Sequence, residues 1–144
     1  MTEATIRRRF IEAIESKNSL FDSYNDSNEN TIVLTWNGGD NADEIEIYVS
    51  FKIMDDDAVL ASISCYDFPN FTDNYYAGLA ACNKLNDDEL VKYYIDEDGD
   101  AVSNTVLLFN SHNIESDFDP NLVLIAATTM AMSADDAFPV LEEI

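Results

Sequence analysis

Residue types on which catalysis and cofactor binding often depend are scarce in this chain. Its 144 residues include one histidine, two cysteines and four glycines. Catalysis with an imidazole base would have to use His112, which lies in the polar stretch 110–113, and such a stretch is typical of a solvated loop. No G-x-S-x-G elbow and no glycine-rich phosphate loop is present. We therefore predict no catalytic residue, no bound cofactor and a protein that is not an enzyme.

The two cysteines, Cys65 and Cys82, are isolated from each other in a strand-like and a helix-like stretch. They suggest neither a disulfide framework nor a C-x-x-C metal pair, so we expect two buried, reduced thiols. Arg7, Arg8 and Arg9 are not followed by the apolar block of a signal peptide. We therefore expect an uncleaved, cytoplasmic protein.

Basic residues and long hydrophobic runs are also scarce. The chain has seven Lys and Arg and 29 Asp and Glu, which gives a net charge of -22. Residues 18–144 hold 26 of the acids and three lysines. Ordinary binding to nucleic acid or anionic lipid needs a positive surface, so both partners are excluded. The longest apolar candidate, 122–132, is far shorter than the roughly 18 residues that a membrane helix needs. No membrane span is predicted.

Hydrophobic spacing in the first half of the chain predicts one helix and a meander of strands. Residues 3–17 form an amphipathic helix after a Thr2 start signal, and residues 19–30 suit a short edge strand and a polar turn. Strict alternation then predicts strands over 31–37, 45–53 and 59–65.

The second half predicts helix, hairpin and helix. Thr72 is a cap for a helix that runs to about Asn86 and places Tyr75, Leu79, Cys82 and Leu85 on one face. Two strands, 91–95 and 102–109, meet through the turn pair Asp98-Gly99. Asp119 and Pro120 then start a last helix, which Pro139 ends or bends and whose apolar stripe is Leu122, Ile125, Ala126, Thr129, Met130 and Ser133.

This order favours a single α+β domain over residues 1–144. No alternating strand and helix pattern requires a parallel sheet. The economical architecture is an antiparallel sheet of about five to six strands with helices packed on one face.

Two acidic stretches imitate metal sites. Asp96, Asp98 and Asp100 match the first three ligands of a calcium loop, but Ala101 and Leu107 stand where that loop needs glycine and a closing carboxylate. A hairpin turn explains this stretch better, and residues 55–57 also suit a turn. We therefore predict no metal site.

Residues 81–100 resemble the YbjN family of small bacterial proteins. Asn83 and Asn86 match its N-x-x-N pair at a helix end, and residues 96–100 match its D-E-D-G-D-like hairpin. The resemblance implies a fold similar to type III secretion chaperones, frequent homodimers and a role as a sensory transduction regulator. From the residues themselves, Asn86 suits the helix end, and Asn83 could lock the hairpin to the helix.

Three functions stay open at this point. The first is a chaperone-like or regulatory protein-binding module, which binds a protein of unknown identity or a second copy through an edge strand, a sheet face or a helix. The second is an acidic mimic of nucleic acid that occupies a DNA-binding protein. The third is an enzyme of unrecognised type, with carboxylates converging in a pocket.

Overall fold

The computed structural model describes residues 2–16, 19–28, 30–109 and 118–143 as an α+β structure with one antiparallel sheet. In chain order the elements are α1 (Glu3–Ser16), β1 (Ser23–Asn25), β2 (Ile32–Trp36), β3 (Ile45–Ile53), β4 (Val59–Cys65), α2 (Tyr75–Asp88), β5 (Lys92–Ile95), β6 (Ala101–Phe109) and α4 (Pro120–Glu142). The six strands lie in the order β1-β2-β3-β4-β6-β5. The predicted fold class is therefore confirmed.

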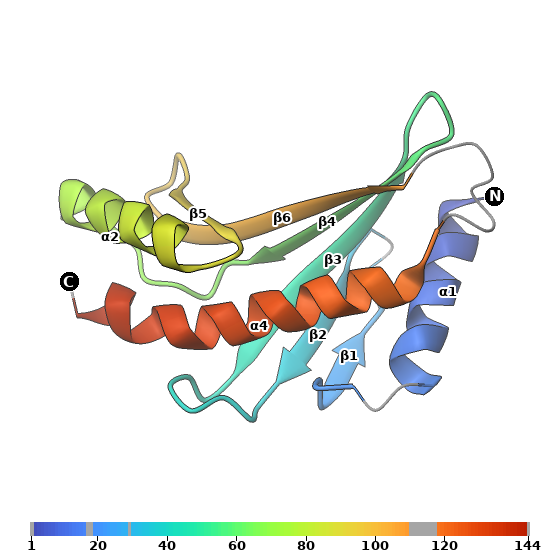
Figure 1. Ribbon diagram of the computed structural model, residues 1–144, viewed down its shortest axis with the longest axis horizontal. Coiled ribbons are helices and arrows are strands. Elements are labelled where there is room, and N and C mark those ends of the chain that lie inside the picture. The colour runs from blue at the N-terminus through green and yellow to red at the C-terminus, as the bar shows by residue number, and fades with distance from the viewer. Residues whose placement is uncertain (1, 17–18, 29, 110–117, 144) are drawn as a thin grey trace.

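The helices cover one face of this twisted sheet (Figure 1). Helix α4 crosses β3, β4 and β6, while α1 contacts β3 and α4, and α2 packs on β5 and touches α4. Because side chains alternate along a strand, every second residue of β3 enters the core, and Ile45, Ile47 and Val49 are fully buried. The opposite face of the sheet carries no helix among the described residues.

Two groups of aromatic rings fill the ends of the core beneath α4. At its start, Phe118 meets Phe51 and Phe109 edge to face, with ring centres 5.7 and 5.0 Å apart. At its other end, Phe68 lies 5.0 Å from Phe138 and 5.6 Å from Tyr93. These rings join helices to strands from distant parts of the sequence, so they hold the layers together.

The first helix confirms its predicted stripe, since Ile6, Phe10, Ala13 and Ile14 are its buried residues. Thr2 Oγ1 accepts the Thr5 N–H at 3.2 Å, as expected of a start signal. The predicted edge strand is β1, and the turn at Gly99 has the positive φ of +87° that favours glycine.

The prediction for α2 was partly wrong. The helix begins after Asn74, and the Thr72 side chain donates instead to the Asp98 carbonyl at 3.3 Å. Tyr75 is exposed, and the buried residues are Gly78, Ala81, Cys82 and Leu85. Gly78 lies on the buried face of α2 because Phe71 packs directly against it. A β-carbon at Gly78 would lie 2.5 Å from the Phe71 ring.

The prediction for α4 was also partly wrong. Asp119 caps the helix, and its side chain accepts the Asn121 N–H as expected. The predicted stripe is confirmed at Met130 and Ser133, which are buried, but it is wrong at Leu122 and Ile125, which are half or more exposed. Val123, Leu124 and Ala127 are buried instead. Pro139 does not end the helix, which continues to Glu142. No helix in the described part of the chain has the length and apolar character needed to cross a membrane.

A buried acid explains the rotation of α4. Asp135 faces the loop between β2 and β3, where its two carboxylate oxygens accept the backbone N–H groups of Asp40, Asn41 and Ala42 at 2.9 to 3.0 Å. Gly39 lies against the same carboxylate, and a β-carbon there would come within 2.5 Å of Oδ1. A buried carboxylate is stable only when such donors surround it, so this contact selects the face of α4 that turns inward.

Replacement of Asp135 with alanine should lower the free energy of unfolding by about 3 kcal/mol, because the buried carboxylate gives up three hydrogen bonds to backbone N–H groups of the loop. Urea unfolding followed by circular dichroism measures this. The matched control is Asp136→Ala, which removes the exposed neighbouring acid and should change stability by less than about 0.5 kcal/mol. Equal losses in the two variants would contradict the anchoring role of Asp135.

Candidate functional site

Among the described residues, the helices cover only one face of the sheet (Figure 1), and we call the other face the open face. The strand register places its side chains in rows, one of which joins Val33, Tyr48, Ser64, Asn104 and Lys92 across five strands. The open face comprises Ser23, Asn25, Val33, Thr35, Glu46, Tyr48, Ser50, Lys52, Leu60, Ser62, Ser64, Tyr66, Lys92, Tyr94, Val102, Asn104, Val106 and Leu108.

Polar and aromatic contacts order the middle of the open face. Tyr48 and Tyr66 meet edge to face with ring centres 5.2 Å apart, and the Tyr48 hydroxyl donates to Glu46 Oε2 at 3.1 Å. Asn104 Nδ2 donates to Ser64 Oγ at 2.8 Å. A hollow of about 380 Å³ is lined by Tyr48, Tyr66, Ser64 and Asn104 together with Thr31, Ser50 and Ser62. Paired side chains in a fixed arrangement form a pre-ordered surface.

Two tyrosines of the open face, Tyr48 and Tyr94, have pKa values raised above the ordinary value of a phenol. Burial, with help from the hydrogen bond to Glu46, raises the pKa of Tyr48 to about 12. Burial also raises the pKa of Tyr94, and the ammonium group of Lys92 lies 5.9 Å from the centre of its ring. Desolvation disfavours the phenolate form, so these groups remain hydrogen-bonding phenols.

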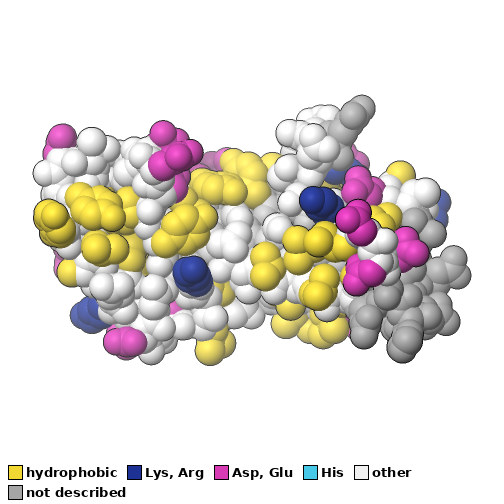
Figure 2. All heavy atoms as spheres, turned by 90° about the horizontal axis from the view of Figure 1, so that it is seen from above, with side chains coloured by type: hydrophobic (Ala, Val, Ile, Leu, Met, Phe, Trp, Pro, Cys, Tyr) yellow, Lys and Arg dark blue, Asp and Glu magenta, His cyan; other side chains and the backbone are white. Residues whose placement is uncertain are grey.

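Acidic side chains are nearly absent from the open face. In a chain with 29 acids, Glu46 is the one acid among the residues that define this face, whereas Lys52 and Lys92 are two of the three lysines after residue 17. Figure 2 views the side where β6 and β4 lie uppermost in Figure 1, and its acids gather toward the two ends, with hydrophobic and neutral polar side chains between them. The open face is thus electrostatically unlike the rest of the chain.

Apolar side chains are exposed on the same face. Val106 and Leu108 are 54% and 66% exposed, and Tyr66 is 51% exposed. A neutral surface with exposed aliphatic and tyrosine side chains has the composition of a protein interface, from whose centre acids are depleted. Nothing about its lining suggests a reactive group.

The two edge strands, β5 and β1, are poorly suited to binding another strand. At the β5 edge, Asn86 Nδ2 donates to the Tyr93 carbonyl at 2.9 Å and Asn86 Oδ1 accepts the Tyr93 N–H at 2.6 Å. One side-chain amide thereby occupies the backbone groups with which a further strand would pair. The other edge strand, β1, is three residues long. Edge-strand addition, one of the binding modes expected from the sequence, therefore has little available backbone at β1 and at Tyr93, whereas residues 105–109 of β6 pair with β4 on one side and extend beyond the register of β5 on the other.

The roles expected of the two asparagines were wrong in part. Asn86 does not bond the last turn of its helix, and it, rather than the exposed Asn83, locks the helix to the hairpin. The sequence could not decide this, because the choice depends on which residue of α2 faces β5.

The acidic hairpin at 96–100 is built as a turn. Asp96 Oδ1 accepts the N–H groups of Asp98 and Asp100, each at 3.0 Å, and Asn70 Nδ2 bonds the Asp98 carbonyl and Asp100 Oδ1 at 2.9 Å. In the described part of the chain, no group of three or more His, Cys, Asp and Glu is arranged to hold a metal ion. His112 lies outside the described residues.

Both cysteines are free and buried, as expected from the sequence. Burial raises the pKa of the Cys65 thiol to about 12 and also raises that of Cys82. A thiol with a raised pKa is a poor nucleophile, so neither residue has the character of a reactive cysteine.

The exposed sides of β3 and β4 hold Glu46 as their single acid, which the alternation by itself did not bring out. The signal for these exposed sides was present in the alternation, because Tyr48, Ser50 and Lys52 interleave with the buried residues, and Ser62 and Ser64 do so in β4. The chain matches no protein-family model and no curated protein.

Asn86→Ala should lower the free energy of unfolding by about 1 to 3 kcal/mol, because the N–H and carbonyl of Tyr93 both lose their partner. The matched control is Asn83→Ala, one turn earlier on the same helix and exposed like Asn86, whereas Asn86 is the one that bonds Tyr93. Urea unfolding at several protein concentrations measures both stability and association. If Asn86→Ala behaves like Asn83→Ala, Asn86 does not secure the sheet edge.

Proposed function

We propose that the chain is a non-catalytic protein-binding module whose open face binds a second copy of the chain. The observation that carries this proposal is the near absence of acids from that face in a chain of net charge -22. We further propose that the module belongs to the chaperone-like or regulatory class and works in the cytoplasm.

Electrostatics supports a second copy as the occupant. Two chains that each carry a charge of -22 repel one another over most of their surfaces. They can approach closely only where acids are few, and this condition favours the open face. A neutral surface with exposed Val106, Leu108 and Tyr66 then gains free energy from burial without bringing like charges together.

The charges that do lie on the open face suit a twofold arrangement. Glu46 and Lys52 occupy the first and last open-face positions of β3. A twofold axis that lies between two facing sheets and runs across β3 reverses the strand direction in the second copy. Each Glu46 would then stand over Lys52 of the other copy, so the surface is self-complementary.

The distribution of acids favours protein binding over mimicry of nucleic acid. A mimic would present a continuous stripe of carboxylates in place of phosphates. Here the acids fall in separate turns and element ends, as at 40–46, 55–57, 87–89 and 96–100. The local resemblance to the YbjN family at residues 81–100 gives separate support to a protein-interaction role.

Light scattering coupled to size exclusion tests the proposal directly. The natural chain should give a mass near twice 16.1 kDa, and high salt should not dissociate it, because the interface is mostly uncharged and salt weakens the repulsion between the two acidic chains. Val106→Asp places an acid on the β6 part of the open face, on a side chain that is 54% exposed, and should shift the mass to that of a monomer. The shift should correspond to at least tenfold weaker association.

The matched control is Ile125→Asp, which places the same charge on the helical side of the sheet at a residue that is 61% exposed. It should remain dimeric, and circular dichroism should confirm that both variants are folded. A natural chain that stays monomeric at every concentration would overturn the proposal, as would dissociation caused by Ile125→Asp alone.

A further inference from the structure

Strand β6 is longer than the edge strand β5 that pairs with it. The register with β4 covers residues 103–109 of β6, whereas the register with β5 covers residues 101–104 only. In Figure 1, β6 accordingly continues past β5 along the upper border of the sheet. On the side away from β4, residues 105–109 therefore have no neighbouring strand among the described residues, and we call this stretch the β6 edge.

The direction of the backbone groups at the β6 edge follows from bonds near its hairpin. The Asp96 N–H donates to the Asp100 carbonyl at 2.9 Å on the β5 side, whereas the Ala101 N–H donates in the opposite direction, to the segment that follows β4. Backbone groups of successive residues point to opposite sides of an antiparallel strand, so the even-numbered residues of β6 face the β5 side. The N–H and C=O groups of Val106 and Leu108 therefore point outward at the β6 edge.

The side chains of the β6 edge are neutral and mostly apolar. No residue of β6 is charged, in a chain with 29 acids and seven bases. Val106 and Leu108 are exposed, and they are the residues whose backbone groups point outward. Proteins commonly protect a free strand edge with a lysine, a proline or a bulge, and residues 105–109 contain none of these. The β6 edge is thus open to a further strand.

Acidic side chains stand at both ends of the β6 edge. At one end, residues 87–89 lie where α2 ends before β5, whose first residue pairs with Asn104. At the other end, residues 55–57 form the turn before β4, whose first residue pairs with Phe109. Both stretches consist of acids only, and all of these acids except Glu89 are exposed.

These acids favour a basic partner over a second copy of the chain. Antiparallel pairing of two β6 edges would place residues 87–89 of one copy beside residues 55–57 of the other, and parallel pairing would place each stretch beside itself. Like charges would face each other in both arrangements. Lys52 and Lys92, on the open face nearby, are too few to balance six acids. A strand with Lys or Arg on both sides of an apolar centre meets opposite charge at both ends.

We propose that the β6 edge binds an extended segment of a partner protein, with aliphatic residues at its centre and Lys or Arg at both ends. The segment adds a strand beside β6 by bonding the N–H and C=O groups of Val106 and Leu108. Its central side chains pack beside the exposed side chains of these two residues, and its basic ends reach the acids. This site is separate from the proposed pairing of open faces and does not depend on it.

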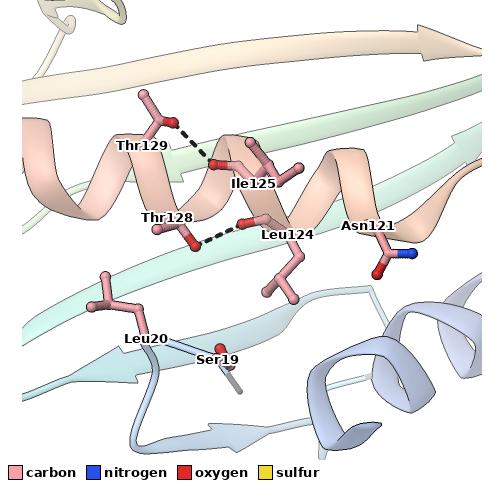
Figure 3. Close-up of a pocket in the computed structure, with 7 residues that line it drawn as sticks. All are labelled: Ser19, Leu20, Asn121, Leu124, Ile125, Thr128 and Thr129. Carbon is pink, nitrogen blue, oxygen red and sulfur yellow. Dashed lines mark hydrogen bonds between the residues drawn. The ribbon is translucent and has the colours of Figure 1, made fainter. Parts of the chain in front are cut away.

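A groove between α4 and the segment that joins α1 to β1 is the competing apolar surface. Its volume is about 720 Å³, and Figure 3 shows Leu20 and Leu124 on its two sides. The hydroxyls of Thr128 and Thr129 donate to carbonyls of their own helix, at 2.9 and 3.0 Å. The described lining offers an extended segment no free row of backbone groups, so the signals of Leu124 and Thr128 serve as an internal control.

Amide hydrogen exchange of the free chain tests the β6 edge itself. Val106 and Leu108 should exchange at least about tenfold faster than Thr105 and Leu107, whose N–H groups face β4. Equal protection at the four positions would mean that the edge is already paired, by the same chain or by a second copy, and would overturn the proposal.

The binding probe is the peptide Lys-Lys-Thr-Val-Thr-Val-Thr-Lys-Lys, whose valines would stand opposite Val106 and Leu108. Titration should give saturable shifts of amide signals over residues 105–109 and slow exchange at these two residues, with no change at Leu124 and Thr128. The same peptide with glutamate in place of lysine should bind at least about tenfold more weakly. Shifts at the groove alone, no saturable shift, or equal affinity for the two peptides would overturn the proposal.

Two methylated forms of the lysine peptide separate strand addition from attraction between charges. N-methylation of both valines removes the donors that face β6 and should weaken binding at least about tenfold. N-methylation of two threonines adds the same number of methyl groups on the side away from β6 and should change affinity less than about threefold. Equal affinity of the two methylated peptides would contradict strand addition.

The acids at the end of α2 are tested by a double variant. Asp87→Asn with Asp88→Asn should weaken binding of the lysine peptide about threefold, since both side chains are exposed beside the β6 edge. The matched control is Asp43→Asn with Glu44→Gln, which removes the same charge from exposed residues before β3 and should leave affinity unchanged. Equal effects of the two double variants would overturn the assignment of the basic ends. These readouts are local to the β6 edge, so they hold whether or not the open faces pair.

Discussion

The contact between the Asp135 carboxylate and the loop that joins β2 to β3 determines how the two layers meet. Helix α4 is apolar around much of its circumference, so hydrophobicity alone does not fix which side faces the sheet. The carboxylate can be buried only where the N–H groups of residues 40–42 surround it, and this fixes the rotation of the helix. That rotation buries Val123 and Ala127 and leaves Leu122 and Ile125 outside.

Coverage of one sheet face leaves the molecule with two unlike surfaces. On the helical side, α1, α2 and α4 bury the core and leave one neutral groove. On the other side, the sheet presents tyrosine, serine and aliphatic side chains with a single acid among the residues of the open face. In a chain of net charge -22, a neutral surface is where long-range repulsion interferes least with association. The acidity therefore restricts where a second acidic molecule can bind.

The ends of the sheet are protected by different means. At β5, the Asn86 amide pairs with the backbone of Tyr93 much as a neighbouring strand would, and β1 is too short to offer a long row of free groups. Side-chain pairing at Tyr93 and a short strand at β1 restrict strand addition at these two places, while residues 105–109 of β6 extend beyond the register of β5. This also gives a structural role to one of the two asparagines that suggested the family resemblance, while Asn83 stays exposed.

The sequence alone determined the elements whose cause is local. Strict alternation in 45–53, helical spacing in 3–17, the glycine turn at 99 and the cap at Asp119 each depend on nearby residues, and the structure confirms them. Tertiary contacts decided the rest, because they join residues far apart in the chain. Phe71 packing on Gly78 turned α2, Asp135 rotated α4, and Asn86 rather than Asn83 met β5. The alternation of β3 and β4 indicates which side chains lie on the open face. The near lack of acids on this face becomes visible only from the strand register, because it depends on side chains from several strands that are neighbours in space.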